Sequence, residues 1–87
     1  MFVIVCYDVT EKRVTKVRKT VSKYLRPVQN SVFEGFLTES RVSSLKKELS
    51  GLINTQEDSV VLYKYLPGVS FTKDEIGVRR NSDIGFL

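Results

Sequence analysis

Residues 2–27 read FVIVCYDVTEKRVTKVRKTVSKYLRP, a short apolar run followed by a segment with helical periodicity. The continuous apolar, β-branched and aromatic run at Phe2–Tyr7 is typical of a strand that is buried on both faces. Asp8 ends this strand and Thr10 is placed to cap a helix. Pro27 then stops the helix, because its ring disfavours helical geometry at the preceding residue. The stretch therefore predicts a β-strand followed directly by an α-helix.

The predicted helix has two faces of opposite character. One face carries an apolar stripe at helical spacing, formed by Val14, Val17, Val21, Tyr24 and Leu25. The other face carries five basic residues within a sector of about 80°: Lys12, Lys16, Lys19, Lys23 and Arg26. A solvated helix face usually mixes charge signs, because pairs of opposite charge at i,i+4 stabilise it. Since only Glu11 lies nearby, the pattern favours a track for nucleic-acid phosphates over an ordinary solvated face.

The segment after Pro27 predicts a second strand and a second helix. Val28–Leu37 has the apolar content of a strand, and Gly35 marks a bulge or a close backbone approach within it. Thr38 is expected to cap the helix. The buried stripe of this helix is expected to consist of Val42, Leu45, Leu49, Leu52 and Ile53.

Three β segments are expected after the second helix, at Ser59–Leu66, Lys73–Val78 and Ile84–Leu87. We interpret the order as βαββαβ with a small β addition at the C-terminal end. This order predicts an α+β, ferredoxin-like fold for residues 1–87 as a single domain, with two helices on one face of an antiparallel sheet. Aromatic side chains then crowd the open face, so we expect a second copy of the chain to cover it. The aromatic residues assigned to that face are Tyr7, Phe33, Tyr63 and Tyr65.

Composition excludes several classes of site. The 87 residues include a single cysteine and no histidine, which excludes an intrachain disulfide, a zinc finger and catalysis by histidine. Cys6 is expected to be a buried small hydrophobe in a reducing compartment. No segment resembles a membrane span or a signal peptide, so we expect a cytoplasmic protein. The net charge of +4 is concentrated in residues 1–30, which hold seven Lys or Arg against two acidic residues.

Asp8 is the best candidate for chemistry in this chain. It follows the apolar strand and precedes the basic helix, where a carboxylate is costly to bury. In one interpretation Asp8 accepts N–H bonds from the start of the helix or pairs with Lys12 or Arg13. In the other, Asp8 meets its symmetry mate across a two-fold axis and the pair holds Mg²⁺ or Mn²⁺, which prefer hard oxygen ligands. Ser31 is a further candidate, either as a phosphate contact or as a hydroxyl that bonds backbone.

Several strings of residues occur together in an order and spacing that resemble a known family. They are Tyr7-Asp8-Val9 with Lys12-Arg13, then Val28-Gln29-Asn30-Ser31-Val32-Phe33-Glu34-Gly35, and finally Asp58-Ser59-Val60 with Tyr63. Over nearly its whole length the chain resembles the small CRISPR-associated spacer-acquisition proteins. These are the second of the two near-universal adaptation proteins and the partners of the CRISPR integrase.

The resemblance implies a ferredoxin-like homodimer whose sheets face each other, with the C-terminal strand extending the partner's sheet. It also implies a metal-dependent endonuclease activity, on single-stranded RNA in some members and on double-stranded DNA in others. In the adaptation complex such a dimer spans the protospacer duplex between integrase dimers. Carried onto this chain, the resemblance makes Asp8 the ligand of Mg²⁺ or Mn²⁺. It assigns phosphate contacts to Lys12, Arg13 and Arg26, and it places Tyr7, Ser31 and Phe33 near the site.

Three alternatives stay open at this point. In the first alternative, the dimer is a pure scaffold that holds protospacer DNA for the integrase, and Asp8 has a structural role only. A second alternative is a toxin-type ribonuclease of the same fold, which fits the string at residues 31–34 less well. The third is a small-molecule regulatory domain, which the glycine-poor loops and the basic helix disfavour.

Overall fold

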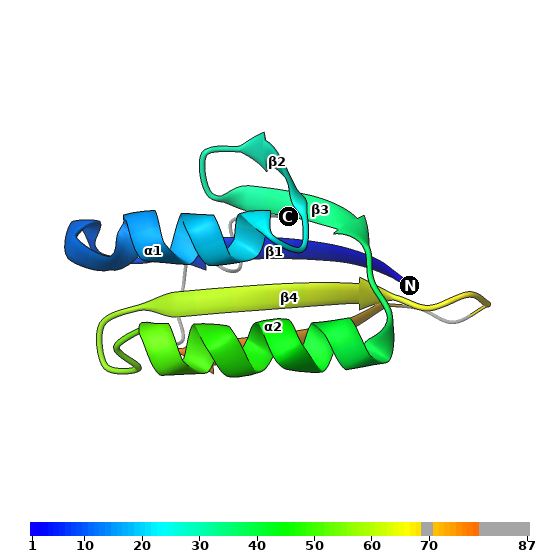
Figure 1. The fold of residues 1–87 in the computed structure, drawn as a ribbon. Coiled ribbons are helices and arrows are strands. Elements are labelled where there is room, and N and C mark those ends of the chain that lie inside the picture. Colours follow the sequence, from blue (N-terminus) through cyan, green and yellow to red (C-terminus); the bar gives the residue numbers. More distant parts are fainter. Residues whose placement is uncertain (69–70, 79–87) are drawn as a thin grey trace.

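The protein forms an antiparallel sheet with two helices packed on one of its faces (Figure 1). The structure is a computed structural model that describes residues 1–68 and 71–78. Its elements are β1 (Phe2–Asp8), α1 (Glu11–Ser22), β2 (Arg26–Gln29), β3 (Val32–Phe36), α2 (Glu39–Leu52), β4 (Ser59–Tyr65) and β5 (Phe71–Gly77). The strands lie in the order β2-β3-β1-β4-β5, and every pair of neighbours is antiparallel. The predicted α+β, ferredoxin-like class is confirmed.

The segment between the helices is a hairpin, so the prediction of one strand over Val28–Leu37 is wrong. The first helix ends at Ser22, and the chain enters β2 at Arg26 before it turns at residues 30–31 into β3. Because β2 is an edge strand, Pro27 is tolerated there without its N–H. Arg26 therefore lies on the sheet edge, and the prediction that it continues the basic face of the helix is also wrong.

The side chains of β1 alternate between the two faces of the sheet. Val3, Val5 and Tyr7 are buried beneath the helices. On the opposite face Cys6 is half-buried, and this burial raises the pKa of its thiol. Within the described residues, β1 is therefore buried on one face only, and the expectation of a strand buried on both faces is wrong. Cys6 is half-buried rather than buried as expected. Among the residues that the structure describes, the helices cover one face of the sheet and no element covers the other, which we call the open face.

Two of the four aromatic residues expected on the open face lie in the core instead. Val5 is in register with Phe33, so Phe33 shares the helix-covered face with Tyr7, and the two rings stack with centroids 6.0 Å apart. Tyr63 and Tyr65 lie on the open face as expected, because they pair with even-numbered residues of β1. The alternation of side chains along a strand makes this assignment depend on single-residue parity.

The core between the sheet and the helices is filled mainly by aliphatic side chains. The fully or almost fully buried ones on the helices are Val17, Val21, Val42, Leu45 and Leu49. The hydroxyl of Thr38 accepts a hydrogen bond from the N–H of Arg41 at 3.2 Å, which confirms the predicted cap of α2. Leu52, the last residue of α2, is only half-buried.

The second half of the chain follows the prediction closely. The strands expected at Ser59–Leu66 and Lys73–Val78 are β4 and β5. The segment Ile84–Leu87, predicted as a short β piece, lies outside the described residues. Among the residues that the structure describes, no helix has the length and apolar character needed to cross a membrane.

Candidate functional site

A buried carboxylate that sequence reasoning did not single out organises the start of α1. Asp58 has no solvent-exposed area and accepts hydrogen bonds from the backbone N–H of Thr10 at 3.0 Å and of Asn54 at 2.9 Å. The Nε of Arg13 lies 2.7 Å from its Oδ2, and the same guanidinium reaches Glu57 at 2.6 Å. The hydrogen bonds from Arg13, helped by the two backbone donors, outweigh burial and lower the pKa of Asp58 to about 2.

This arrangement bears on two predicted site residues. Asp58 accepts N–H bonds and forms an ion pair at the start of α1, a role that one interpretation gave to Asp8. Arg13 is the cation of that pair, with a side chain only 19% exposed, and its guanidinium is held between Asp58 and Glu57. Thr10 occupies the cap position, but among the described residues its hydroxyl has no hydrogen-bond partner. The backbone N–H of Thr10 is instead held by Asp58.

Asp8 stands at the exposed carboxyl end of β1, in register with Ser59 of β4. Alternation along the strand places it on the open face, because Tyr7 before it is buried under the helices. The N–H of Tyr7 donates to the carbonyl of Ser31 at 3.1 Å, so the turn between β2 and β3 lies beside the end of β1. The fold thus brings Tyr7, Asp8, Ser31 and Phe33, four of the predicted site residues, to one end of the sheet.

Arg18 is a residue that sequence reasoning missed at this end of the sheet. Its guanidinium donates to the carbonyl of Asn30 at 3.0 Å and lies 5.6 Å from the centre of the Phe33 ring. The hydroxyl of Tyr7 donates to the same carbonyl at 3.3 Å. Together these contacts hold the hairpin turn against α1. Arg18 does not belong to the row of five basic residues predicted for the helix, and only the hairpin after the helix shows which groups its guanidinium contacts.

The carboxylates that the structure describes in one chain do not gather into a metal centre. Among the described residues there is no group of three or more His, Cys, Asp or Glu side chains that could hold an ion. Asp8 offers hard oxygen donors in an exposed place, but a single carboxylate per chain is too few for a resident metal. The expected Mg²⁺ or Mn²⁺ site therefore depends on a second copy of the chain.

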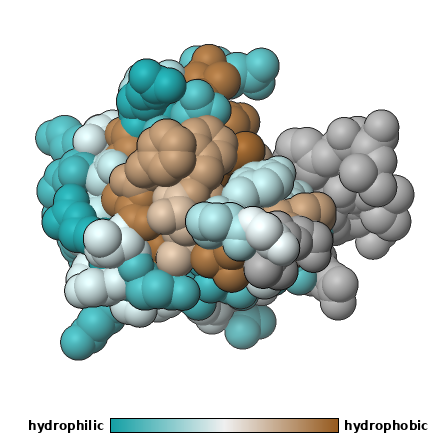
Figure 2. All heavy atoms as spheres, turned by 90° about the vertical axis from the view of Figure 1, so that its right-hand side faces the viewer, coloured by the Kyte–Doolittle hydropathy of each residue, from teal (hydrophilic) through white to brown (hydrophobic). Residues whose placement is uncertain are grey.

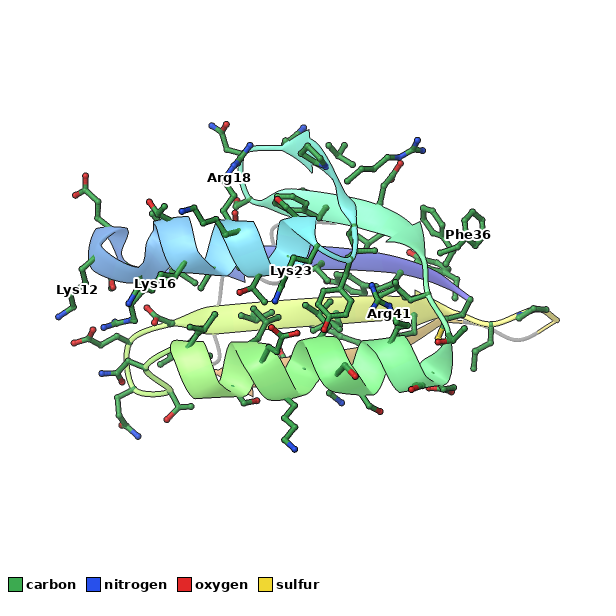
Figure 3. The ribbon with its side chains drawn as sticks, viewed as in Figure 1. Lys12, Lys16, Arg18, Lys23, Phe36 and Arg41 are labelled. Carbon is green, nitrogen blue, oxygen red and sulfur yellow. The ribbon has the colours of Figure 1, made fainter. Side chains whose placement is uncertain are left out.

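The basic face of α1 is real but smaller than predicted. Figure 3 shows Lys12, Lys16 and Lys23 along the helix, on a different side of it from Arg18. Lys12, Lys16 and Lys19 are exposed, and within the described residues no ion pair involves them. Lys23 instead pairs with Glu48 of α2 at 2.6 Å. We call Lys12, Lys16 and Lys19 the lysine stripe from here on.

Around Lys23 the two helices exchange polar contacts. The hydroxyl of Tyr24 also donates to Glu48, and these two partners lower the pKa of the glutamate. The guanidinium of Arg41 lies 4.4 Å from the centre of the Tyr24 ring. Arg26, on β2, lies 3.5 Å from Glu34. Lys23 and Arg26 thus remain cations at the surface, but each has an acidic neighbour.

The fold and the site define a small ferredoxin-like protein with a basic helix and an exposed carboxylate at a strand end. Comparison with known proteins narrows this class. The family model described as CRISPR associated protein Cas2 matches residues 1–72, and the chain belongs to this family. The resemblance found in the sequence is thereby confirmed.

Individual relatives agree with this assignment. The chain is 46% identical over 87 residues to the CRISPR-associated endoribonuclease Cas2 of Thermotoga maritima, covering 100% of this chain and 99% of the relative. It is 41% identical over 81 residues to the protein of the same name from Dictyoglomus turgidum, with 93% of each covered. A crystal structure of Cas2 matches with a TM-score of 0.70 and 43% identity over 72% of this chain and 71% of that one. Streptococcus pyogenes Cas2 matches with a TM-score of 0.65 and 27% identity, over 98% and 94%.

Proposed function

We propose that this chain acts as a homodimer in CRISPR spacer acquisition and cleaves nucleic acid with a divalent metal ion held by Asp8 of each copy. Membership of the Cas2 family and the endoribonuclease names of its relatives support a nuclease. The observation that carries the proposal is the different placement of two carboxylates. Asp58 is buried and bonded at the start of α1, whereas Asp8 is exposed beside the turn that contains Ser31.

The open face of the sheet supports the homodimer. Tyr65 and Phe71 are 41% and 49% exposed there, and their ring centroids are 5.5 Å apart. Soluble monomers seldom leave contiguous apolar patches of this kind in water. A second copy packed on this face would bury both rings. With the two-fold axis near Asp8, the same contact would bring two carboxylates together.

The chemistry of the donors fits a hard divalent cation. Two Asp8 side chains would supply carboxylate oxygens, and phosphate oxygens and waters would complete the octahedral shell that Mg²⁺ or Mn²⁺ prefers. A divalent ion held by the Asp8 carboxylates would supply an activated water and would offset the negative charge on the leaving oxygen. No histidine or lysine base is then needed, which suits a chain without histidine.

The residues around Asp8 have supporting roles in this proposal. Tyr7 and Arg18 hold the carbonyl of Asn30, so the hydroxyl of Ser31 stays near the end of β1 and would contact a phosphate oxygen. The lysine stripe lies on α1, on the helix-covered side of the sheet. It would attract phosphates without touching the bond that breaks.

Single-stranded RNA is the first substrate to test, because the relatives are named endoribonucleases. Double-stranded DNA is the second. The lysine stripe favours a further candidate function, in which the dimer holds protospacer DNA for the CRISPR integrase without cutting it. Both functions place the protein with nucleic acid in the cytoplasm.

The test uses the purified full-length chain with single-stranded RNA and with double-stranded DNA, in Mg²⁺, in Mn²⁺ and in EDTA. We expect a dimer by sedimentation at tens of micromolar and cleavage of at least one substrate in metal but not in EDTA. Undiminished cleavage in EDTA, or a monomer at that concentration, would contradict the proposal. Salt-sensitive binding without cleavage would support the scaffold function instead.

A further inference from the structure

A hollow of about 470 Å³ lies at the opposite end of the sheet from Asp8. Its main lining residues are Phe2, Lys23, Leu25, Arg26, Glu34 and Phe36. Figure 2 looks onto this end of the molecule and shows apolar side chains gathered between hydrophilic ones. No contact assigned to the Asp8 site involves this hollow.

The hollow exists because the hairpin is uneven. Strand β2 begins at Arg26, which pairs with Glu34, so the last residues of β3 pair with β1 on one side but have no partner strand on the β2 side. Residues 23–25, which connect α1 to β2, line the opposite side of the hollow. Gly35 lies on this stretch of β3, where an added Cβ would come within 3.0 Å of the Leu25 side chain. The glycine thus lets the Leu25 side chain lie close to this stretch of β3.

Phe36 is the most exposed large apolar side chain among the described residues, with 79% of its area accessible. Its ring packs edge-to-face on Phe2 with centroids 5.1 Å apart, so one partner supports it while most of the ring stays in solvent. Figure 3 shows Phe36 at the far end of the molecule from Lys12. A supported, exposed aromatic ring is the element that proteins use to stack an unpaired base.

The rim of the hollow is basic. Lys23 and Arg26 both line it, with side chains 59% and 77% exposed, and each could leave its glutamate to meet a phosphate. Lys23 lies one helical turn beyond Lys19, so the hollow begins where the lysine stripe ends. An apolar peptide would gain nothing from this row of cations. A nucleic-acid strand would use both features, since its phosphates and its bases alternate along one backbone.

We infer that this hollow binds one unpaired nucleobase, stacked on Phe36, of a single strand whose phosphates lie along Lys19, Lys23 and Arg26. The inference rests on the nucleic-acid binding proposed above and specifies the form of the ligand, an unpaired strand or a frayed end rather than a continuous duplex. Phe36 pairs with Phe2 on the open face of the sheet, and the row of rings continues from Phe2 to Tyr65. The inference therefore requires that the second copy, packed about a two-fold axis near Asp8, leaves Phe36 at the edge of the covered area and accessible to solvent.

The experiment compares binding of the full-length protein to oligouridine and to a blunt-ended DNA duplex by fluorescence anisotropy, in EDTA so that nothing is cut. Phe36→Ala is expected to weaken oligouridine binding about 5- to 150-fold, the range for loss of one stacked base. Its affinity for the duplex is expected to stay within about twofold of that of the unmodified protein. Phe36→Trp is expected to restore binding. Val28→Ala truncates another exposed apolar side chain, outside the hollow, and serves as the matched control.

A second pair of probes separates stacking from charge. An oligonucleotide with abasic sites keeps its phosphates, so the unmodified protein should bind it as weakly as Phe36→Ala binds oligouridine. Equal affinities of Phe36→Ala and the unmodified protein for oligouridine would overturn the inference while leaving the proposed function intact. A shift of Phe36→Ala to monomer in sedimentation, with oligouridine affinity unchanged, would assign Phe36 to a contact between copies and would also overturn it. If the unmodified protein binds neither oligouridine nor the DNA duplex, both the inference and the proposed function fail.

Discussion

Replacing Asp58 by Asn should destabilise the fold strongly, because its carboxylate holds the start of α1. The side chain is buried and accepts hydrogen bonds from Thr10, Asn54 and Arg13. Lowering its pKa from 3.8 to about 2 corresponds to about 2.5 kcal/mol of preference for the charged form in the folded state. Asp58→Asn keeps the size but loses this charge, so we expect a loss of about 2–3 kcal/mol in the free energy of unfolding. That loss corresponds to a fall of about 10–20 °C in the melting temperature of a domain of this size.

The sign of the pH dependence follows from the lowered pKa. The stabilisation from Asp58 is complete above its unfolded value near 3.8 and is lost as the pH falls through the folded value of about 2. Thermal unfolding followed by circular dichroism, at neutral pH and through the acid range, measures both effects. The difference between the unmodified protein and Asp58→Asn should shrink at the acid end.

Asp8→Asn is the matched control for this experiment. Asp8 is exposed at the end of β1, so its replacement should change the free energy of unfolding by no more than about 0.5 kcal/mol. The reasoning is refuted if Asp58→Asn is as stable as the unmodified protein, or if Asp8→Asn costs as much stability as Asp58→Asn.

Three other predictions test separate parts of the structure. Gly77→Ala should cost more than about 2 kcal/mol in a denaturant titration, because φ is +92° and the new Cβ would lie 2.0 Å from the Asp58 carbonyl oxygen. Gly68→Ala, with φ of +72° and open space around it, should cost only about 1 kcal/mol, and equal costs would contradict this account. The thiol of Cys6 should react with iodoacetamide more slowly in the folded protein than in urea, because burial raises its pKa, and equal rates would contradict this prediction. Glutamine substitution throughout the lysine stripe should reduce the slope of log affinity against log salt by about 2.7 per chain for duplex DNA, whereas an unchanged slope would make the stripe an ordinary solvated face.

The elements with strong periodicity could be predicted from the sequence. The run at Phe2–Tyr7 indicates β1, and the apolar stripes indicate both helices. Thr38 caps α2 through its hydroxyl as its residue type suggests, and Gly35 lies where the backbone closely approaches Leu25. Each of these features depends on neighbours in sequence or on a single local geometry.

The hairpin and the buried ion pair could not be predicted in the same way. Pro27 reads equally as a helix stop and as an edge-strand residue, and only the pairing of β2 with β3 decides between the two. Asp58 lies 48 residues from Thr10 and 45 from Arg13, so no local pattern connects them. The fold buries the Asp58 side chain completely, and this burial depends on those distant partners.

The distinction between the two carboxylates also changes the interpretation of the candidate site. A lone Asp after a strand is ambiguous in sequence between a helix cap and a metal ligand. The structure gives the bonds at the start of α1 to Asp58 and leaves Asp8 at the exposed end of β1, on the open face. This placement supports the role that the family resemblance assigns to Asp8, and it makes Asp8→Asn an informative substitution.

The central claim is tested most directly by the single-turnover rate of cleavage by Asp8→Asn, relative to that of the unmodified protein. Both proteins are purified identically and assayed in the same Mg²⁺ or Mn²⁺ concentration, on the substrate that the unmodified protein cleaves. We predict that Asp8→Asn melts at the same temperature, binds the substrate with the same affinity and shows no cleavage above background. Cleavage by Asp8→Asn at the rate of the unmodified protein would contradict the claim that this carboxylate holds the catalytic metal.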